Sequence, residues 1–250
     1  MNWLLIHGGG MTGRFWDRLA PHLDGEVLAP DLPGRRGRPG DLVTLTVEQE
    51  VAAILADVEA AELPGPIVVV AHSSGGLTVP GVVAGLGERV AAILLIAAAV
   101  PPPGGSGLDC MQPRHAEGVR LAQQIAQDSG EPLFTSGPPA DPEKFRTTYG
   151  GEPLDDETLA YVTDPERCVV DTMHHYFQPV SWDAVPTSIP VTYVRTEHDN
   201  PIPAALQDEM VERLPSPPTV VRLESGHIPP VTDSEGFAAI CRRVASAFGS

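Results

Sequence analysis

IVVVAHSSGGL, residues 67–77, runs five apolar residues into a histidine, two serines and two glycines. A continuous apolar run of this length is typical of a strand buried on both faces of a parallel sheet. When such a strand passes through a sharp turn into a helix, the turn can present a nucleophile, provided that the residues two before and two after it are small. Ser73 has Ala71 and Gly75 at these positions, whereas Ser74 would have a histidine two residues before it. The pattern therefore favours Ser73 as a nucleophile. An alternative interpretation is that the serines cap a helix beginning near Gly75.

Short apolar runs alternate with helical patterns along the chain, which indicates parallel βα units. We expect strands at 3–7, 26–29, 67–71, 91–98, 190–195 and 218–223. Helical patterns lie at about 12–23, 47–61, 75–87, 204–214 and 234–248. The sequence predicts an α/β fold with a mostly parallel six-stranded sheet flanked by helices.

The alternation breaks between residues 101 and 185. The segment PPPGGSG opens this region, and its proline and glycine content excludes an inner strand or helix there. Helical pieces are expected at 113–128 and 156–177. We interpret 101–185 as a helical cap inserted into a core formed by residues 1–100 and 186–250.

The composition limits the possible partners. The 250 residues carry 33 acidic and 16 basic side chains, a formal charge of −17, which disfavours binding to nucleic acid or anionic membranes. No apolar run is long enough for a signal or membrane helix, so we expect no membrane insertion. Three cysteines without metal-type spacing favour reduced thiols in a cytoplasmic protein without a metal site. Arg35, Arg36 and Arg38 are expected to lie in a solvated loop.

A second glycine motif follows the first expected strand. Gly8, Gly10 and Gly13 fit the pattern G-x-G-x-x-G, and Asp31 follows at the spacing of a dinucleotide fingerprint. An NAD(P)-dependent oxidoreductase is therefore an alternative. A short-chain dehydrogenase would also need Tyr-x-x-x-Lys, but the only lysine, Lys144, has an alanine four residues before it.

A serine nucleophile needs a histidine base and a carboxylate that orients it. The last two expected strands run into TEHDNPIP and ESGHIPP, which place Asp199 and His227 at the carboxyl ends of neighbouring strands. Together with Ser73 they would meet at one edge of the sheet. Glu197 is an alternative acid two residues before Asp199.

These segments resemble the α/β-hydrolase superfamily over nearly the whole chain. The similarity lies in IHGGG…W, VLAPDLPGRRG, VVVAHSSGGL, VRTEHDNPIP and ESGHIPP, and it is closest to the compact branch of small esterases and plant-type hydroxynitrile lyases. The resemblance implies a Ser73–His227–Asp199 triad with no cofactor. It also implies an oxyanion hole made by the backbone N–H groups of Gly9 and Ser74, and it makes Asp31 part of a structural turn.

The residues beside the expected site distinguish the two activities of this branch. The lyases carry a lysine after the catalytic histidine and a threonine in the first glycine loop, where this chain has Ile228 and Gly8. The resemblance thus implies hydrolysis of a carboxylic ester of a small molecule. Aromatic and methionine residues in 101–185 suggest a mainly apolar substrate. A thioesterase, a lactonase, a tailoring enzyme of a biosynthetic pathway and a slow-turnover ligand-binding protein remain alternatives.

Overall fold

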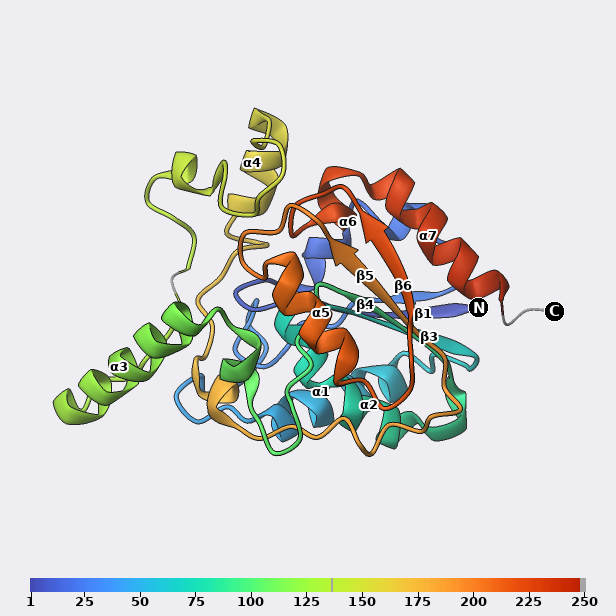
Figure 1. Cartoon of the computed structure of the whole chain (residues 1–250), viewed down its shortest axis with the longest axis horizontal. Helices are drawn as coiled ribbons and strands as arrows, with labels where there is room; N and C mark the ends of the chain where they lie inside the picture. The colour runs from blue at the N-terminus through green and yellow to red at the C-terminus, as the bar shows by residue number, and fades with distance from the viewer. Residues whose placement is uncertain (136, 248–250) are drawn as a thin grey trace.

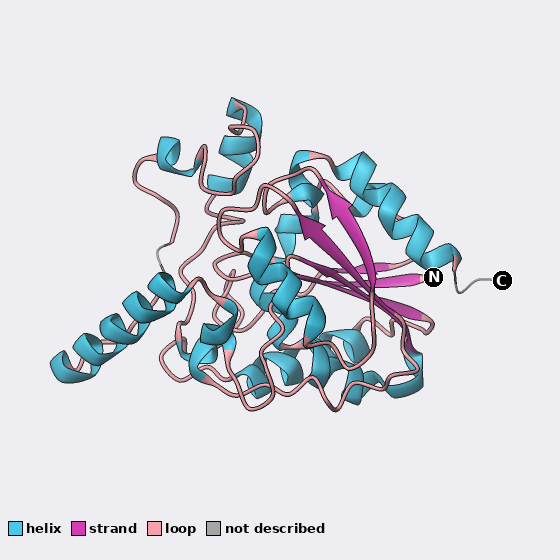
Figure 2. Ribbon diagram, in the orientation of Figure 1, coloured by secondary structure: helices cyan, strands magenta, loops and turns pink. Residues whose placement is uncertain are grey.

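The computed structural model describes residues 1–135 and 137–247. Six strands form one parallel sheet in the order β2-β1-β3-β4-β5-β6 (Figure 1). The strands are β1 (Asn2–Ile6), β2 (Val27–Leu28), β3 (Ile67–His72), β4 (Val90–Ile96), β5 (Val191–Thr196) and β6 (Thr219–Leu223). The predicted fold class is confirmed, because the sheet lies between helices on both of its faces (Figure 2).

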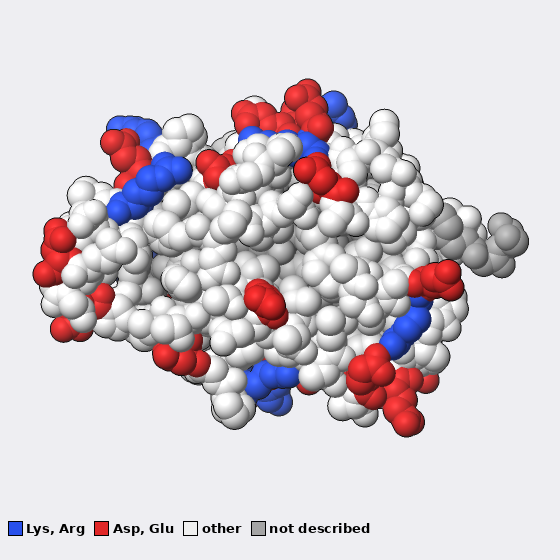
Figure 3. All heavy atoms as spheres, turned by 90° about the horizontal axis from the view of Figure 1, so that it is seen from below, with Lys and Arg blue, Asp and Glu red and all other residues white. Residues whose placement is uncertain are grey.

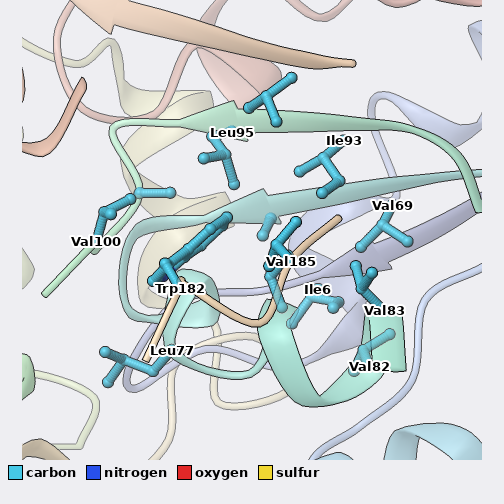
Figure 4. Packing of buried hydrophobic residues seen from close by; sticks show 14 of the residues in the cluster. Ile6, Val69, Leu77, Val82, Val83, Ile93, Leu95, Val100, Trp182 and Val185 are labelled. Atoms are coloured by element: carbon cyan, nitrogen blue, oxygen red, sulfur yellow. The ribbon is translucent and has the colours of Figure 1, made fainter. Parts of the chain in front are cut away.

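Strand β3 lies third in the sheet and is buried along its whole length. Its side chains alternate between two apolar clusters, with Ile67, Val69 and Ala71 in one and Val68 and Val70 in the other. Figure 4 shows the first cluster, where valines of the helix that follows β3 pack against neighbouring strands. Each fully buried valine stabilises the fold by about 1.5–3 kcal/mol relative to an exposed one, so this strand is a rigid support for the turn that follows it.

Helices α1 (Val47–Ala60), α2 (Val79–Leu86) and α5 (Ala204–Glu212) contribute to the first cluster and cover one face of the sheet. Helix α7 (Ser234–Ser246) contributes to the second cluster on the other face, next to the short α6 (Pro229–Thr232). Helix α1 begins at a capping box, in which Thr46 and Gln49 satisfy each other's backbone N–H groups.

One of the predicted core helices was wrong in kind, and another was only partly right. Residues 12–23 form two 3-10 turns, η1 (Gly13–Trp16) and η2 (Ala20–His22), and Pro21 lies within the second. The helix expected at 75–87 is divided into a 3-10 turn, η3 (Ser73–Leu77), and α2. Pro80 is in the first turn of α2, where its missing N–H costs no hydrogen bond.

The region 101–185 contains α3 (Pro113–Ser129), α4 (Asp156–Thr163) and the 3-10 turns η5 (Gly107–Cys110), η6 (Pro142–Phe145) and η7 (His174–Phe177). Helix α3 extends away from the body of the molecule (Figure 1). The single helix predicted at 156–177 was wrong beyond Thr163. Pro165 disfavours helical geometry at Asp164, and the chain then runs irregularly to a bridge between Cys168 and Met11.

The end of this region returns to the core. Trp182 and Val185 are buried in the first cluster, as Figure 4 shows. Closer to the site, isolated bridges join Gly150 to Asp199 and Met11 to Cys168. The interpretation of 101–185 as a cap therefore stays a prediction, but its segments are attached to the loops at the carboxyl ends of the strands.

Acidic side chains are distributed over the face shown in Figure 3, several with a basic side chain beside them. Among the ion pairs of the chain, Glu59 contacts Arg89 and Glu209 contacts Arg213. Within residues 1–135 and 137–247, none of the helices has the length and apolar character needed to cross a bilayer.

Candidate active site

Ser73 follows β3 in a left-handed backbone conformation, with φ of +53°. A non-glycine residue in this region is strained, and the surrounding structure has to hold it there. The Ser73 carbonyl accepts a hydrogen bond from Ala99 N at 2.9 Å. A Cβ atom on Gly75 would lie 2.7 Å from the His7 carbonyl oxygen, so only glycine fits two residues after Ser73. The η3 turn has no side-chain cap, so the helix-capping interpretation of the two serines is wrong.

The loop after β1 lies directly against this turn. A Cβ atom on Gly8 would lie 2.9 Å from Cβ of Ser73, closer than real Cβ contacts. Gly10 has φ of +68° and donates its N–H to Oδ2 of Asp171 at 2.9 Å. The glycines of this loop thus bring its backbone up to Ser73, and Asp171 holds it there. The structure brings Gly9 and Ser74 together as well, with the Ser74 hydroxyl 3.2 Å from where a Cβ on Gly9 would be.

Asp31 has a structural position. Its Oδ1 accepts the N–H of Gly13 at 2.8 Å, and its Oδ2 contacts Arg36 at 3.2 Å. The glycine motif leads into the four-residue turn η1, not into a long helix whose N-terminus would face a pyrophosphate. Asp31 and the glycines of the motif are thus engaged in contacts within the protein, with Arg36 and Asp171 among their partners, which does not favour the dinucleotide-binding interpretation.

His227 and Asp199 are joined by a hydrogen bond of 2.7 Å between Nδ1 and Oδ2. Asp199 also accepts from Thr196 Oγ1 and from the Ile202 N–H, both at 2.7 Å. Both carboxylate oxygens are therefore fixed, and both residues are buried. Glu197, the alternative acid, pairs with Arg195 instead.

The loop that carries His227 is tied to the serine turn through His72. The Nε2–H group of His72 donates to the His227 carbonyl at 2.9 Å, and the two rings lie 4.6 Å apart. On the other side, the ring of Tyr149 stacks parallel to that of His227 at 6.4 Å, and its carbonyl accepts the His227 N–H. Burial and the neighbouring His227 lower the pKa of His72 well below its ordinary value, so His72 stays neutral.

Within the residues that the structure describes, Ser73 Oγ makes no hydrogen bond to His227. Catalytic hydrogen bonds of this kind are often long without substrate and tighten when it binds. The structure therefore brings Ser73, His227, Asp199, Gly9 and Ser74 to one edge of the sheet and leaves their roles as predictions.

A family model described as "Alpha/beta hydrolase family" matches residues 3–240. The chain belongs to this family. It is 29% identical over 248 residues to Lipase LipV of Mycobacterium tuberculosis, with 96% of this chain and 91% of the relative covered. It is 25% identical over 240 residues to a pyrethroid hydrolase of Sphingobium wenxiniae, with 90% and 81% covered. These relatives support a hydrolase.

Solved structures give the same fold. An extracellular alpha/beta-hydrolase from a Paenibacillus species superposes with a TM-score of 0.77 at 17% identity, covering 98% of each chain. A thermophilic esterase from Thermogutta terrifontis superposes with a TM-score of 0.74 at 19% identity, covering 100% of this chain and 91% of that one. The predicted resemblance to α/β-hydrolases is confirmed.

A buried cluster of charged residues lies behind the Gly8–Gly10 loop and was missed by the sequence analysis. Arg35 is 1% exposed and contacts Asp171 and Glu50, while His175 Nδ1 lies 3.1 Å from Glu50. The expectation that Arg35 lies in a solvated loop was wrong. Glu50 gave a signal that could have been used, because it shares the buried face of α1 with Ile54 at helical spacing. A glutamate on the apolar face of a helix indicates that a positively charged or hydrogen-bonding partner is buried next to it.

The cluster is electrostatically balanced. Burial alone would raise the pKa of Asp171, but Arg35, His175 and the N–H groups of Gly10 and Thr172 hold it below its ordinary value. Burial likewise opposes protonation of His175, yet Glu50 raises its pKa overall. Asp171 is thus held in the charged form that accepts the Gly10 N–H.

A groove of about 950 Å³ lies between residues 147–158, which run into the start of α4, and the loops that carry Asp199 and His227. Its lining includes Asp199 but neither Ser73 nor Gly9. The groove therefore adjoins the loops of Asp199 and His227 but does not include the candidate nucleophile. In residues 1–135 and 137–247, no group of three or more His, Cys, Asp or Glu side chains is arranged to hold a metal ion.

Proposed function

We propose that the protein is a serine hydrolase that cleaves a carboxylic ester of a small, mainly apolar molecule. The observation that carries the proposal is the strained Ser73 turn, packed against Gly8 and tied through His72 to the loop of His227. A serine held in this conformation exposes its hydroxyl at the top of the sheet. The names of the two relatives, a lipase and a pyrethroid hydrolase, support an apolar ester.

In the proposed mechanism, Ser73 Oγ attacks the ester carbonyl carbon and His227 Nε2 takes the serine proton. Asp199 keeps the other ring nitrogen of His227 protonated, and it stabilises the imidazolium that forms. The backbone N–H groups of Gly9 and Ser74 hold the oxyanion, each donor contributing roughly 10²–10³ in rate.

The tetrahedral intermediate collapses when the alcohol leaves with the proton from His227. Water then attacks the acyl-enzyme through the same base, and the acid product leaves with Ser73 restored. Residues 101–185 are proposed to cover this site as a cap, since Val169 and Asp171 hydrogen-bond to Gly10 and Gly150 forms a bridge with Asp199.

Ser73→Ala is expected to lower the rate of hydrolysis of p-nitrophenyl butyrate by about three or more orders of magnitude, and His227→Ala should have a similar effect. Activity of either variant within tenfold of the parent would contradict the proposal. A fluorophosphonate probe should modify Ser73, as located by peptide mass spectrometry. Ser74→Ala should keep the label on residue 73, because Ser74 is proposed to act through its backbone.

An oxygen ester, a thioester and a lactone of the same acyl length, each compared at saturation, separate the possible substrate classes. The highest kcat is expected for the oxygen ester. Tight binding with negligible turnover of all three would indicate a ligand-binding protein instead.

A further inference from the structure

Tyr176 lies in the η7 turn of region 101–185, far along the chain from the glycine loop. Its ring occupies space left by Gly107, where a Cβ atom would lie 2.8 Å from Cδ1 of Tyr176 and 3.0 Å from Leu77. The ring of His175 contacts that of Tyr176 edge-on at 4.3 Å. His175 is itself bonded to the buried Glu50. The position of the Tyr176 ring is thus set by packing on several sides.

The hydroxyl group of Tyr176 lies beside Gly9. A Cβ atom on Gly9 would lie only 2.6 Å from Tyr176 Oη and 3.2 Å from Ser74 Oγ. The absence of a side chain on Gly9 is therefore what admits this hydroxyl. The Tyr176 hydroxyl therefore lies next to Gly9 and Ser74, whose backbone N–H groups are the proposed oxyanion donors.

The hydroxyl groups of two other tyrosines, Tyr161 and Tyr193, donate to main-chain carbonyls. Tyr161 donates to the carbonyl of Arg14 at 2.9 Å, and Tyr193 to that of Ala98 at 3.0 Å. Tyr176 instead directs its hydroxyl at the glycine loop of the candidate site. Burial raises the pKa of Tyr176 to about 12, although a hydrogen bond with the Ser74 side chain acts in the opposite direction. The phenol therefore keeps its proton at neutral pH, and its hydroxyl lies between Gly9 and the Ser74 side chain.

We propose that Tyr176 is a third oxyanion donor, giving its O–H hydrogen bond to the carbonyl oxygen of the substrate as negative charge develops there. This inference rests on the proposed ester hydrolysis at Ser73 and names a further residue that takes part in it. A donor held by packing before the reaction needs no reorganisation when charge appears, which is the condition under which such donors accelerate a reaction. In this proposal the oxyanion hole has all three donors only when the η7 turn places the Tyr176 hydroxyl beside Gly9.

Tyr176→Phe removes the hydroxyl and keeps the ring. We expect kcat for p-nitrophenyl butyrate to fall by at least roughly tenfold, with KM changed much less, because the bond strengthens only as charge develops. An alkyl trifluoromethyl ketone adds to the serine and forms a stable oxyanion, so its inhibition constant should rise by a similar factor. Tyr161→Phe is the matched control. It also removes the hydroxyl of a half-buried tyrosine in this region, and it should leave both values within about threefold of the parent.

Substitution at Gly9 tests the placement of the hydroxyl independently of the chemistry. Gly9→Ala should collide with Tyr176 Oη, whereas in a Tyr176→Phe background the nearest atoms are Ser74 Oγ at 3.2 Å and Cζ of residue 176 at 3.7 Å. The melting temperature of Gly9→Ala should therefore fall, and that of the double variant should return to the value of Tyr176→Phe. Non-additivity of this kind is expected only for groups in contact.

The outcomes separate this inference from the proposed function. Loss of kcat together with weaker inhibition in Tyr176→Phe supports it. Activity within threefold of the parent, or a loss of kcat with unchanged inhibition, overturns it while Ser73→Ala remains inactive. If Ser73→Ala itself retains activity, the proposed function fails, and this inference fails with it.

Discussion

Gly8 and Ser73 are in contact across the two loops of the candidate site. A Cβ atom added to Gly8 would lie only 2.9 Å from the Cβ atom of Ser73, so there is no room for a side chain on Gly8. The contact joins the end of β1 to the end of β3, two strands paired in register from Asn2 with Ile67 to Ile6 with Ala71. The sheet therefore fixes how close the glycine loop and the serine turn lie.

Gly8→Ala should displace Ser73 or the loop by several tenths of an ångström. Because small errors of position at a reacting group are costly, we expect kcat/KM for a p-nitrophenyl ester to fall by roughly 10- to 100-fold. Gly118→Ala is the control. Gly118 lies in α3 with open space around it, and replacing it should stabilise the helix by about 0.5–1 kcal/mol without affecting the rate. Equal rates for the two variants would argue against the contact.

Asp199→Asn tests which acid orients His227. The amide is nearly isosteric but favours the wrong tautomer of the imidazole, so kcat should fall by roughly 10⁴. Glu197→Gln should keep activity within about threefold, because Glu197 pairs with Arg195 and Arg222. Steady-state kinetics on both variants measures the difference. A larger loss in the Glu197 variant would assign the role to that residue.

Asp171→Asn should destabilise the protein by about 3 kcal/mol, since it leaves the buried Arg35 with only Glu50, at 3.7 Å, as a carboxylate partner. Urea denaturation at neutral pH measures the loss. The exposed Asp156, which pairs with Arg146, is the matched control, and Asp156→Asn should show no measurable change. Similar stabilities of the two variants would contradict the structural role of the buried cluster.

The free energy of unfolding should fall when the solution is acidified below about pH 6.5. Burial and the charge of Arg35 lower the pKa of His7 from 6.5 to about 3. Between these values the unfolded chain binds a proton that the folded chain does not, so stability falls with decreasing pH, by at most about 1.4 kcal/mol per pH unit for this group. The pKa of His72 is lowered in the same sense.

Urea titrations at several pH values measure this dependence. The NMR signals of the His7 and His72 rings, assigned by substitution, should show no protonation in the folded protein at about pH 5.5. Protonation of either ring above that pH would contradict the prediction.

Local features of the chain were sufficient to predict the sheet and the order of the candidate residues. Apolar runs of five to eight residues locate the inner strands β1, β3 and β4, because a strand buried on both faces has no polar alternation. The edge strands β2 and β6 are partly exposed and give a weaker pattern. The small residues around Ser73, and the places of Asp199 and His227 after successive strands, follow from chain order alone. In a parallel sheet, residues that follow successive strands reach the same edge.

Contacts between distant segments were decided by the tertiary structure. Nothing near Arg35 in sequence shows that it is buried with Asp171, which lies more than a hundred residues away. Nor does the sequence around Tyr176 indicate that its hydroxyl faces Gly9. Hydrophobic periodicity records which side of a strand or helix is buried, whereas the partner of a buried polar group depends on how the loops fold over the sheet.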